Sequence, residues 1–183
     1  MTPAVFFDRD GVVNTSPGAG YVIDWQSFHF SPGIVEALQV CKMRGYLTVL
    51  VTSQQGVGKG LMSQVDLEEI HTRMQDYLAR GGCAFDRIYA CTCLDSDPAC
   101  TCRKPSPEMI HTAATELEID LLTSWLVGDA DRDIQMANNA GISKTIRIES
   151  ENSHQIEATY TLSDTRGLAE LLANLLGIEP DLR

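Results

Sequence analysis

Four aspartates and one lysine stand where the chain could build a site for phosphoryl transfer. Asp8 and Asp10 come at the end of the apolar run "AVFF", and Asp129 and Asp133 follow the run "SWLV". Lys104 precedes a predicted helix. Carboxylates that converge repel one another unless a hard cation lies among them, and oxygen ligands of this kind suit Mg²⁺. An aspartate can also attack phosphorus, while a second carboxylate exchanges protons with the leaving oxygen and with water.

A second group of residues could hold the phosphate itself. Thr52 and Ser53 end the apolar run "TVLV", and the glycine-rich segment "GVGKG" follows. A hydroxyl, backbone N–H groups and a lysine can stabilise phosphoryl charge. Each feature alone is ordinary, since an aspartate after an apolar run is commonly a turn or cap residue and Asp133 alone could simply brace a helix. Their joint occurrence at the ends of successive apolar runs favours one phosphate site.

Four cysteines form two closely spaced pairs just before Lys104. The pairs are Cys91-x-Cys93 and Cys100-x-Cys102. Structural disulfides are rare in cytosolic proteins, and a Cys-x-x-Cys redox motif is absent. Four thiolates that close a tight loop suit tetrahedral Zn²⁺ with no open position for catalysis. We therefore predict a structural zinc in a loop over residues 91–102, which holds Arg103 and Lys104 in a fixed geometry; coincidental cysteines are the alternative.

The bulk composition limits the classes of function. The 183 residues, 44% of them hydrophobic, can bury one sizeable core and predict a single domain over residues 1–183. The formal net charge of −11 repels polyanions, so nucleic acid is not an expected partner. The N-terminal segment "MTPAVFFDRDGVV" lacks a signal-peptide pattern, and no stretch approaches the roughly 20 apolar residues of a membrane span. We expect a soluble cytoplasmic protein that does not bind membranes.

Short apolar runs alternate with segments of helical periodicity. The predicted strands cover residues 4–7, 46–51, 87–90, 125–127, 145–148 and, more weakly, 159–162. The predicted helices cover residues 33–43, 63–80, 106–117, 131–140 and a leucine stripe over 168–176. Ser63 and Asp66 have the spacing of a capping box, and Cys41 lies on an apolar helical face, where we expect it in the core. The alternation predicts an α/β fold with a doubly wound, mainly parallel sheet, helices on both faces and a ligand at the carboxyl ends of the strands.

The polar motifs resemble those of a known family. "FFDRDGVVN" resembles the first motif of the haloacid dehalogenase (HAD) superfamily of phosphohydrolases, and "VLVTSQ", "CRKPSP" and "VGDADRD" resemble its second, third and fourth motifs. The resemblance spans roughly residues 4–148. It implies a HAD-like Rossmannoid fold in which Asp8 is the nucleophile and Asp10 the general acid/base. It also implies that Thr52, Ser53 and Lys104 hold the transferring phosphoryl group, and that Mg²⁺ is bound by Asp8, the Asp10 backbone carbonyl and Asp129.

The cysteine loop narrows the resemblance to one branch. Paired cysteines directly before "CRKP" resemble the branch of D-glycero-D-manno-heptose 1,7-bisphosphate phosphatases and histidinol-phosphate phosphatases, which are typically capless. The chain departs from that branch at Cys93, where a histidine is common, at Ser53, where an asparagine is usual, and at Ala130, where a lysine or arginine is common. The loop between the cysteine pairs is shorter, and the insert over residues 15–21 is longer. Zinc tolerates the first change, whereas the other departures leave the substrate open.

The resemblance also implies which residues meet the substrate, a small phosphorylated metabolite. The implied set is Gly20, Tyr21, Thr52, Ser53, Gln54, Gln55, Lys59, Arg103 and Lys104. Lys59 and Arg103 could meet a second phosphate, which favours a sugar bisphosphate, although Lys59 could also be a solvated loop charge.

The leading hypothesis is a monomeric Mg²⁺-dependent enzyme that removes the 7-phosphate of D-glycero-D-manno-heptose 1,7-bisphosphate through an aspartyl-phosphate. Histidinol-phosphate phosphatase and a broad-specificity phosphomonoesterase are alternatives. A polynucleotide 3′-phosphatase is disfavoured by the acidic charge. A non-catalytic zinc or phosphate-binding module is disfavoured because Asp8, Asp10, Lys104 and Asp129 are all present.

Overall fold

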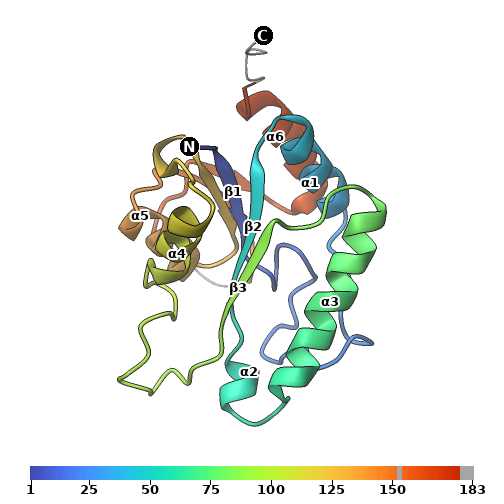
Figure 1. Ribbon diagram of the computed structural model, residues 1–183, viewed down its shortest axis with the longest axis vertical. Coiled ribbons are helices and arrows are strands. Elements are labelled where there is room, and N and C mark those ends of the chain that lie inside the picture. Colours follow the sequence, from blue (N-terminus) through green and yellow to red (C-terminus); the bar gives the residue numbers. More distant parts are fainter. Residues whose placement is uncertain (152–153, 178–183) are drawn as a thin grey trace.

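A parallel six-stranded sheet forms the centre of the computed structural model, which describes residues 1–151 and 154–177 (Figure 1). The strands are β1 (Ala4–Phe7), β2 (Leu47–Ser53), β3 (Arg87–Cys91), β4 (Trp125–Gly128), β5 (Lys144–Ile148) and β6 (Tyr160–Leu162). Their order across the sheet is β3-β2-β1-β4-β5-β6, and every neighbouring pair is parallel. The strand order reverses between β1 and β4, so the ends of these two strands border the crevice where such sheets bind ligands.

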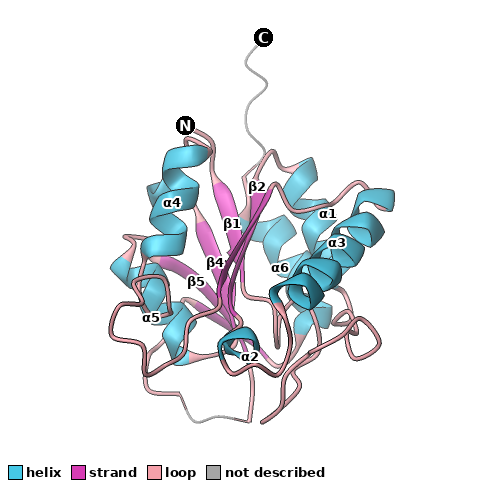
Figure 2. Ribbon diagram, turned by 60° about the horizontal axis from the view of Figure 1, so that its bottom comes forward, coloured by secondary structure: helices cyan, strands magenta, loops and turns pink. Residues whose placement is uncertain are grey.

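Helices cover both faces of this sheet (Figure 2). They are α1 (Ile34–Met43), α2 (Gln55–Gly58), α3 (Gln64–Arg80), α4 (Glu108–Glu116), α5 (Asp131–Asn139) and α6 (Leu168–Leu175), with 3₁₀ turns at Leu121–Thr123 and Thr165–Gly167. Helices α1, α3 and α6 pack on one face and α4 and α5 on the other, each over its own hydrophobic core. The predicted doubly wound α/β architecture is confirmed.

Local sequence signals placed most elements within a few residues. The capping box that starts α3 is confirmed: the Ser63 hydroxyl accepts from the Asp66 N–H at 3.1 Å, and the Asp66 carboxylate accepts from the Ser63 N–H at 2.7 Å. Cys41 is fully buried in the core, as expected. Leu168, Leu172 and Leu176 of the C-terminal stripe are also buried, which confirms a packing face. No helix among the described residues is both long enough and apolar enough to cross a membrane.

Two differences from the prediction bear on the site. Strand β2 continues two residues further than expected, because Thr52 and Ser53 pair with Ala90 and Cys91 of β3. Helix α2, which has only four residues, was not predicted, since a segment so short and glycine-rich has no helical periodicity. The last strand residues and α2 together form one wall around the carboxyl end of the sheet.

Candidate active site

The first and fourth strands bring two aspartates to the same edge of the sheet. Asp8 directly follows β1 and Asp129 directly follows β4, and both side chains are largely buried. The Asp8 N–H donates to the Val127 carbonyl of β4 at 2.9 Å, so the two strand ends are tied together. Residues that are 121 positions apart in the sequence therefore lie in one site because parallel strands end at one edge.

Lys104 reaches this site from the segment before α4. Its ammonium group lies 2.7 Å from Asp8 Oδ1 and 2.7 Å from Asp133 Oδ1, and the lysine side chain is 1% exposed. Asp133 is fully buried in α5, and its carboxylate also accepts from the N–H groups of Asp129 at 3.3 Å and Ala130 at 3.0 Å. Asp133 thus holds both Lys104 and the backbone that carries Asp129.

Burial shapes the electrostatics of these carboxyls. Desolvation raises the pKa of Asp8 to about 6, although the nearby Lys104 opposes this shift. Desolvation, with the Asp8 charge adding to it, raises the pKa of Asp129 to about 7. Burial would also raise the pKa of Asp133, but the Lys104 ammonium outweighs it and holds that pKa below the usual range. Lys104 and the nearby Arg132 therefore leave part of the negative charge of the three buried carboxylates unbalanced.

The residues present fit a divalent cation. Ligand oxygens of Asp8, Asp129 and Asp133 all lie within 4.8 Å of one another. Asp129 Oδ1 is buried and has no hydrogen-bond partner among the described residues, although a buried carboxylate oxygen normally has one. Because Asp133 is already held by Lys104 and two backbone donors, Asp8 and Asp129 are the side chains left for Mg²⁺, which favours a few carboxylates and shared phosphate oxygens.

Asp10 lies beside this group and has partners of its own. Its carboxylate accepts from Asn14 Nδ2 at 3.0 Å, from Gln54 Nε2 at 2.8 Å and from Arg9 Nη2 at 3.2 Å. Gln54 Nε2 also donates to Thr52 Oγ1 at 2.7 Å. Burial would raise the pKa of Asp10, but the Arg9 charge and these donors hold it below the usual value. Gln54, implied by resemblance to bind substrate, is thus buried and joins Asp10 to Thr52.

The four cysteines gather as predicted. The Sγ atoms of Cys91 and Cys100 are 3.6 Å apart, and those of Cys93 and Cys102 and of Cys100 and Cys102 are each 3.8 Å apart. A tetrahedron with Zn–S bonds of about 2.3 Å has sulfur–sulfur distances of about 3.8 Å. The thiols are unbridged, so the cluster is consistent with a zinc site and not with a pair of disulfides.

The other residues implied to bind substrate come from separate segments of the chain. Ser53 Oγ is buried without a partner among the described residues, so it is available to a ligand. Lys59 is exposed, and its ammonium group lies 2.8 Å from the Tyr21 hydroxyl, which is itself 3.4 Å from Gln55 Oε1. Arg103 Nε donates to Asp95 at 2.8 Å, while its Nη1 is buried and also lacks a partner in the described part of the chain.

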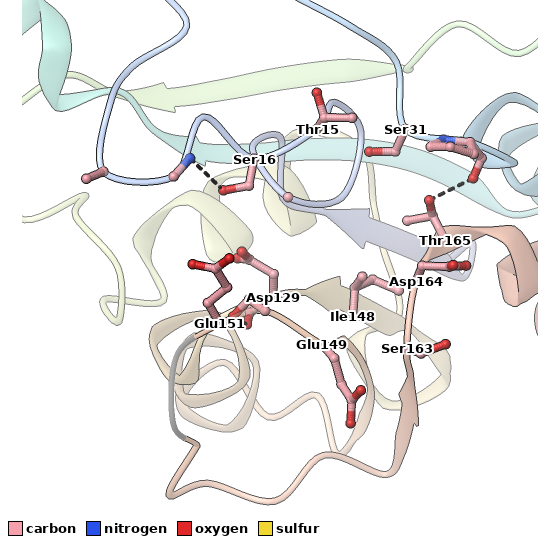
Figure 3. Close-up of a pocket in the computed structure, with 15 residues that line it drawn as sticks. Thr15, Ser16, Ser31, Asp129, Ile148, Glu149, Glu151, Ser163, Asp164 and Thr165 are labelled. Carbon is pink, nitrogen blue, oxygen red and sulfur yellow. Dashed lines mark hydrogen bonds between the residues drawn. The ribbon is translucent and has the colours of Figure 1, made fainter.

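A cavity of about 590 Å³ opens on the other side of the aspartates (Figure 3). Its lining residues are Gly11 and Asp129, four residues of the segment after the first motif (Thr15, Ser16, Gly18 and Ala19), Ser31 and Pro32, and residues 148–151 and 163–165. Figure 3 shows Glu151 next to Asp129, with Ser16 on the facing wall. None of the described lining residues is a lysine or arginine. This side of the opening therefore offers hydroxyls and carboxylates, and the cations lie elsewhere.

The amino-acid sequence of this chain is similar to those of known proteins. The HAD-hydrolase-like family model matches residues 101–166. A D-glycero-beta-D-manno-heptose-1,7-bisphosphate 7-phosphatase from Pasteurella multocida is 36% identical over 96% of this chain and 99% of its own length. A D-glycero-alpha-D-manno-heptose-1,7-bisphosphate 7-phosphatase from Burkholderia mallei is 34% identical over 97% of this chain and 96% of its own.

Solved structures agree with these matches. A D,D-heptose 1,7-bisphosphate phosphatase from B. bronchiseptica, complexed with magnesium and phosphate, superposes with a TM-score of 0.85 at 31% identity, covering 94% of this chain and 99% of the other. A putative HAD-like phosphatase from Mesorhizobium loti gives a TM-score of 0.86 at 28% identity, covering 100% of this chain and 90% of the other. The fold is that of a HAD-like hydrolase. Within that class, the chain belongs to the family of D-glycero-D-manno-heptose-1,7-bisphosphate 7-phosphatases.

Sequence reasoning missed several members of the site. Arg9 and Asn14 both contact Asp10, yet Arg9 reads as an ordinary charge between two aspartates and Asn14 as a turn residue. The sequence places Asp133 among the strand-end aspartates and gives it no role of its own beyond a brace or cap, whereas in the structure it also holds Lys104. The signal that could have found Asn14 is its place four residues after Asp10 in "DGVVN", where the chain turns back on itself.

Proposed function

We propose that this chain is a Mg²⁺-dependent phosphatase that removes the 7-phosphate of D-glycero-D-manno-heptose 1,7-bisphosphate through an aspartyl-phosphate. The observation that carries the proposal is the convergence of Asp8, Asp129 and Lys104, from three separate segments, on one buried position. The full-length similarity to phosphatases of this family supports the substrate class.

The first half of the reaction belongs to Asp8. Mg²⁺, held by Asp8, Asp129 and the backbone carbonyl of Asp10, would neutralise negative charge on the phosphoryl group. The Asp8 carboxylate attacks phosphorus as the bond between phosphorus and the sugar oxygen breaks, and the leaving oxygen takes a proton from Asp10. Lys104 and the hydroxyls of Thr52 and Ser53 stabilise the charge on the transferring group.

The second half returns the enzyme to its starting state. Water attacks the aspartyl-phosphate and gives its proton to Asp10, which had lost one to the leaving oxygen. The bond between Asp8 and phosphorus breaks, and inorganic phosphate leaves. Asn14, Gln54 and Arg9 hold the Asp10 carboxylate in one place through both halves.

The second phosphate of the substrate would lie on the side of Arg103 and Lys59. Both residues lie beside the cysteine loop over residues 91–102. Arg103 pairs with Asp95 of this loop, and a Cβ on Gly58, next to Lys59, would lie 2.6 Å from the Thr92 carbonyl of the same loop. The buried, unpartnered Nη1 of Arg103 supports an anionic ligand there. The cavity beside Asp129 offers no such cation among its described lining residues.

One observation favours a second candidate, histidinol phosphate. Glu149 and Glu151 line the cavity beside Asp129, and carboxylates there would suit the ammonium group of that substrate. The comparisons weigh against this candidate, because the relatives that match nearly the whole chain are heptose bisphosphate phosphatases, with β and α anomers both represented. A broad phosphomonoesterase would show similar activity on all of these esters.

The test combines a nucleophile variant with a substrate panel. Asp8→Asn is expected to abolish phosphate release, since an amide cannot form the acyl-phosphate, whereas Asp76→Asn, which changes an exposed carboxylate on α3, should retain activity. Wild-type kcat/KM is compared for both anomers of the heptose bisphosphate and for histidinol phosphate.

The outcomes separate mechanism from substrate. Full turnover by Asp8→Asn would remove the covalent mechanism. An inactive Asp8→Asn together with a clear wild-type preference for histidinol phosphate would retain the mechanism and replace the substrate. Trapping of the resting enzyme by beryllium fluoride, a phosphoryl mimic, should require Asp8 as well.

Four further expectations complete the proposal. We propose that Cys91, Cys93, Cys100 and Cys102 hold a structural Zn²⁺, a set supported by the near-tetrahedral sulfur spacing. A single domain over residues 1–183, a monomeric state and a cytoplasmic location stay predictions. The two cores that pack on opposite faces of one sheet support the first of these three.

A further inference from the structure

A fully buried arginine stands between the two aspartates of the first motif. Arg9 is 0% exposed, although a charged side chain is almost never fully buried without a partner. Its Nη2 lies 3.2 Å from both carboxylate oxygens of Asp10. Its Nη1 lies 3.3 Å from Nε2 of His71 on α3, and its Nε has no partner among the described residues. Arg9 thus joins Asp10 to a helix on one face of the sheet.

His71 can act here only as an acceptor. A guanidinium has donors and no acceptor, so the Nε2 atom that faces Arg9 must carry a lone pair, and the ring proton must be on Nδ1. Burial, followed by the Arg9 charge, lowers the pKa of His71 to about 4, which agrees with a neutral ring. His71 therefore holds the outer end of the arginine while Asp10 holds the inner end.

The contacts of Asp10 leave Arg9 as its only charged donor in the described part of the chain. Asn14 donates to Oδ1 and Gln54 to Oδ2, while Arg9 contacts both oxygens from behind. Leaving a buried cation without its carboxylate partner costs several kcal/mol. Rotation of the Asp10 side chain would separate it from Arg9, so the pair resists that rotation.

From this geometry we propose that Arg9, braced by His71, is a positioning residue that fixes the carboxylate of Asp10 where it exchanges protons with the leaving oxygen and with water. This inference rests on the proposed function, because it assigns Arg9 a role only through Asp10. A proton-transfer group must lie within hydrogen-bond reach of its target, so a carboxylate free to rotate loses much of its effect.

The competing explanation is that Arg9 and His71 merely fill and stabilise the core. The two explanations differ in which esters they affect. An alkyl phosphate, such as a sugar phosphate, needs a proton on its leaving oxygen, whereas a nitrophenyl phosphate releases a stable anion without one. Loss of positioning should therefore slow the first turnover of the alkyl ester much more than that of the aryl ester.

The experiment measures single-turnover rates of the full chain with Mg²⁺ on the preferred alkyl phosphate and on para-nitrophenyl phosphate. In Arg9→Met, which keeps most of the length without the charge, the alkyl rate should fall about 100-fold, the usual scale of general acid catalysis, with little change in the single-turnover rate of nitrophenolate release from the aryl ester. His71→Leu should shift the rates in the same direction, and His71→Gln, which keeps an acceptor, should restore them. Arg73→Met, at a half-exposed arginine on α3, serves as the control.

Several outcomes would overturn the inference. Equal losses on both esters would show a structural role, and so would a His71→Gln variant no better than His71→Leu. If Arg9→Met fails to fold, the two His71 variants still decide the question. The proposed function is tested separately. If the Asp8→Asn variant still turns over substrate, the covalent mechanism is wrong. If Asp8→Asn is inactive but the Arg9 and His71 variants slow both esters equally, only the present inference is wrong.

Discussion

Two glycines place the carboxylates of the site by lacking a side chain. A Cβ on Gly11 would lie 2.4 Å from Asp129 Oδ2, and a Cβ on Gly128 would lie 2.3 Å from the Cβ of Asp133. Real Cβ atoms do not approach other atoms so closely, so each aspartate occupies space that any other residue would fill. At the residue scale, the positions of Asp129 and Asp133 therefore depend on the absence of a Cβ atom at Gly11 and Gly128.

Gly11→Ala should therefore weaken Mg²⁺ binding. The new methyl group displaces Asp129, and the backbone at φ 91° adds a strain of about 1–2 kcal/mol. We expect a higher Mg²⁺ concentration for half-maximal activity, measured by titration, and a lower free energy of unfolding.

Gly45→Ala separates the two effects. Gly45 also has a positive φ, 77°, but a Cβ there would meet nothing within 4 Å, so this variant carries the strain without the clash. If Gly11→Ala needs no more Mg²⁺ than Gly45→Ala does, then Gly11 does not set the position of Asp129.

At the scale of elements, the cysteine loop and α2 support each other. A Cβ on Gly58, the last residue of α2, would lie 2.6 Å from the Thr92 carbonyl and 3.2 Å from the Leu94 N–H nitrogen, so the helix packs directly on the loop backbone. The same loop leads into Arg103 and the buried Lys104. A change in the loop should therefore reach both walls of the substrate opening.

Removal of the proposed zinc should test this coupling. Purified protein is expected to carry one zinc per chain, and stripping it with a chelator should release Lys104 from Asp8 and lower kcat/KM by about 100-fold, the scale of a misplaced active-site group. Backbone hydrogen exchange should increase over residues 91–104 and in α2, while α6 stays protected.

Variants of single cysteines provide the matched control. Cys102→Ser removes one proposed zinc ligand, whereas Cys83→Ser changes a buried thiol outside the cluster and keeps a donor for the Leu78 carbonyl. Protein that carries no zinc, or that keeps full activity after zinc is removed, would contradict the proposal of a structural zinc.

At the scale of the whole molecule, the buried negative charges of Asp8 and Asp129 lower the stability of the metal-free folded state, and a bound metal ion would neutralise them. The folded-state pKa values of Asp8, about 6, and Asp129, about 7, both lie above the ordinary value of 3.8. Between roughly pH 4 and 7 the metal-free folded state therefore binds more protons than the unfolded state. Its stability from these two groups is present at low pH and is lost as the pH rises through 6 to 7.

Mg²⁺ should consequently stabilise the protein more at pH 8 than at pH 5. At a concentration 100 times its Kd, a ligand of the folded state adds about 2.7 kcal/mol, or roughly 5–10 °C in Tm for a protein of this size. We expect such a shift at pH 8 and a much smaller one at pH 5, because protons compete for Asp8 and Asp129. The difference in Tm with and without Mg²⁺ at each pH cancels the titration of the other groups.

The Asp129→Asn variant provides the contrast for this measurement. It removes one of the two raised pKa values and one proposed metal ligand, so its Tm should depend little on Mg²⁺ at either pH. An equal Mg²⁺ effect at pH 5 and pH 8 in the wild-type protein would show that these carboxyls do not govern metal binding.

The sequence by itself determined which residue types stand at the strand ends and the alternation of strands and helices that carries them. Asp8 and Asp129 follow apolar runs that had to be buried strands, and parallel strands end at one edge, so their meeting was predictable. The capping box at Ser63 and the spacing of the four cysteines are local signals that act within a few residues, and the structure keeps both.

Only the tertiary structure decided which polar groups pair inside that frame. Asp133 with Lys104, Arg9 with His71, and Gly58 against Thr92 join residues 29, 62 and 34 positions apart. No periodicity or turn signal encodes such contacts, because they arise where separate elements pack and each buried charge must find a partner. The short helix α2 belongs with them, since its four residues have too little local preference to form a helix without the loop that covers them.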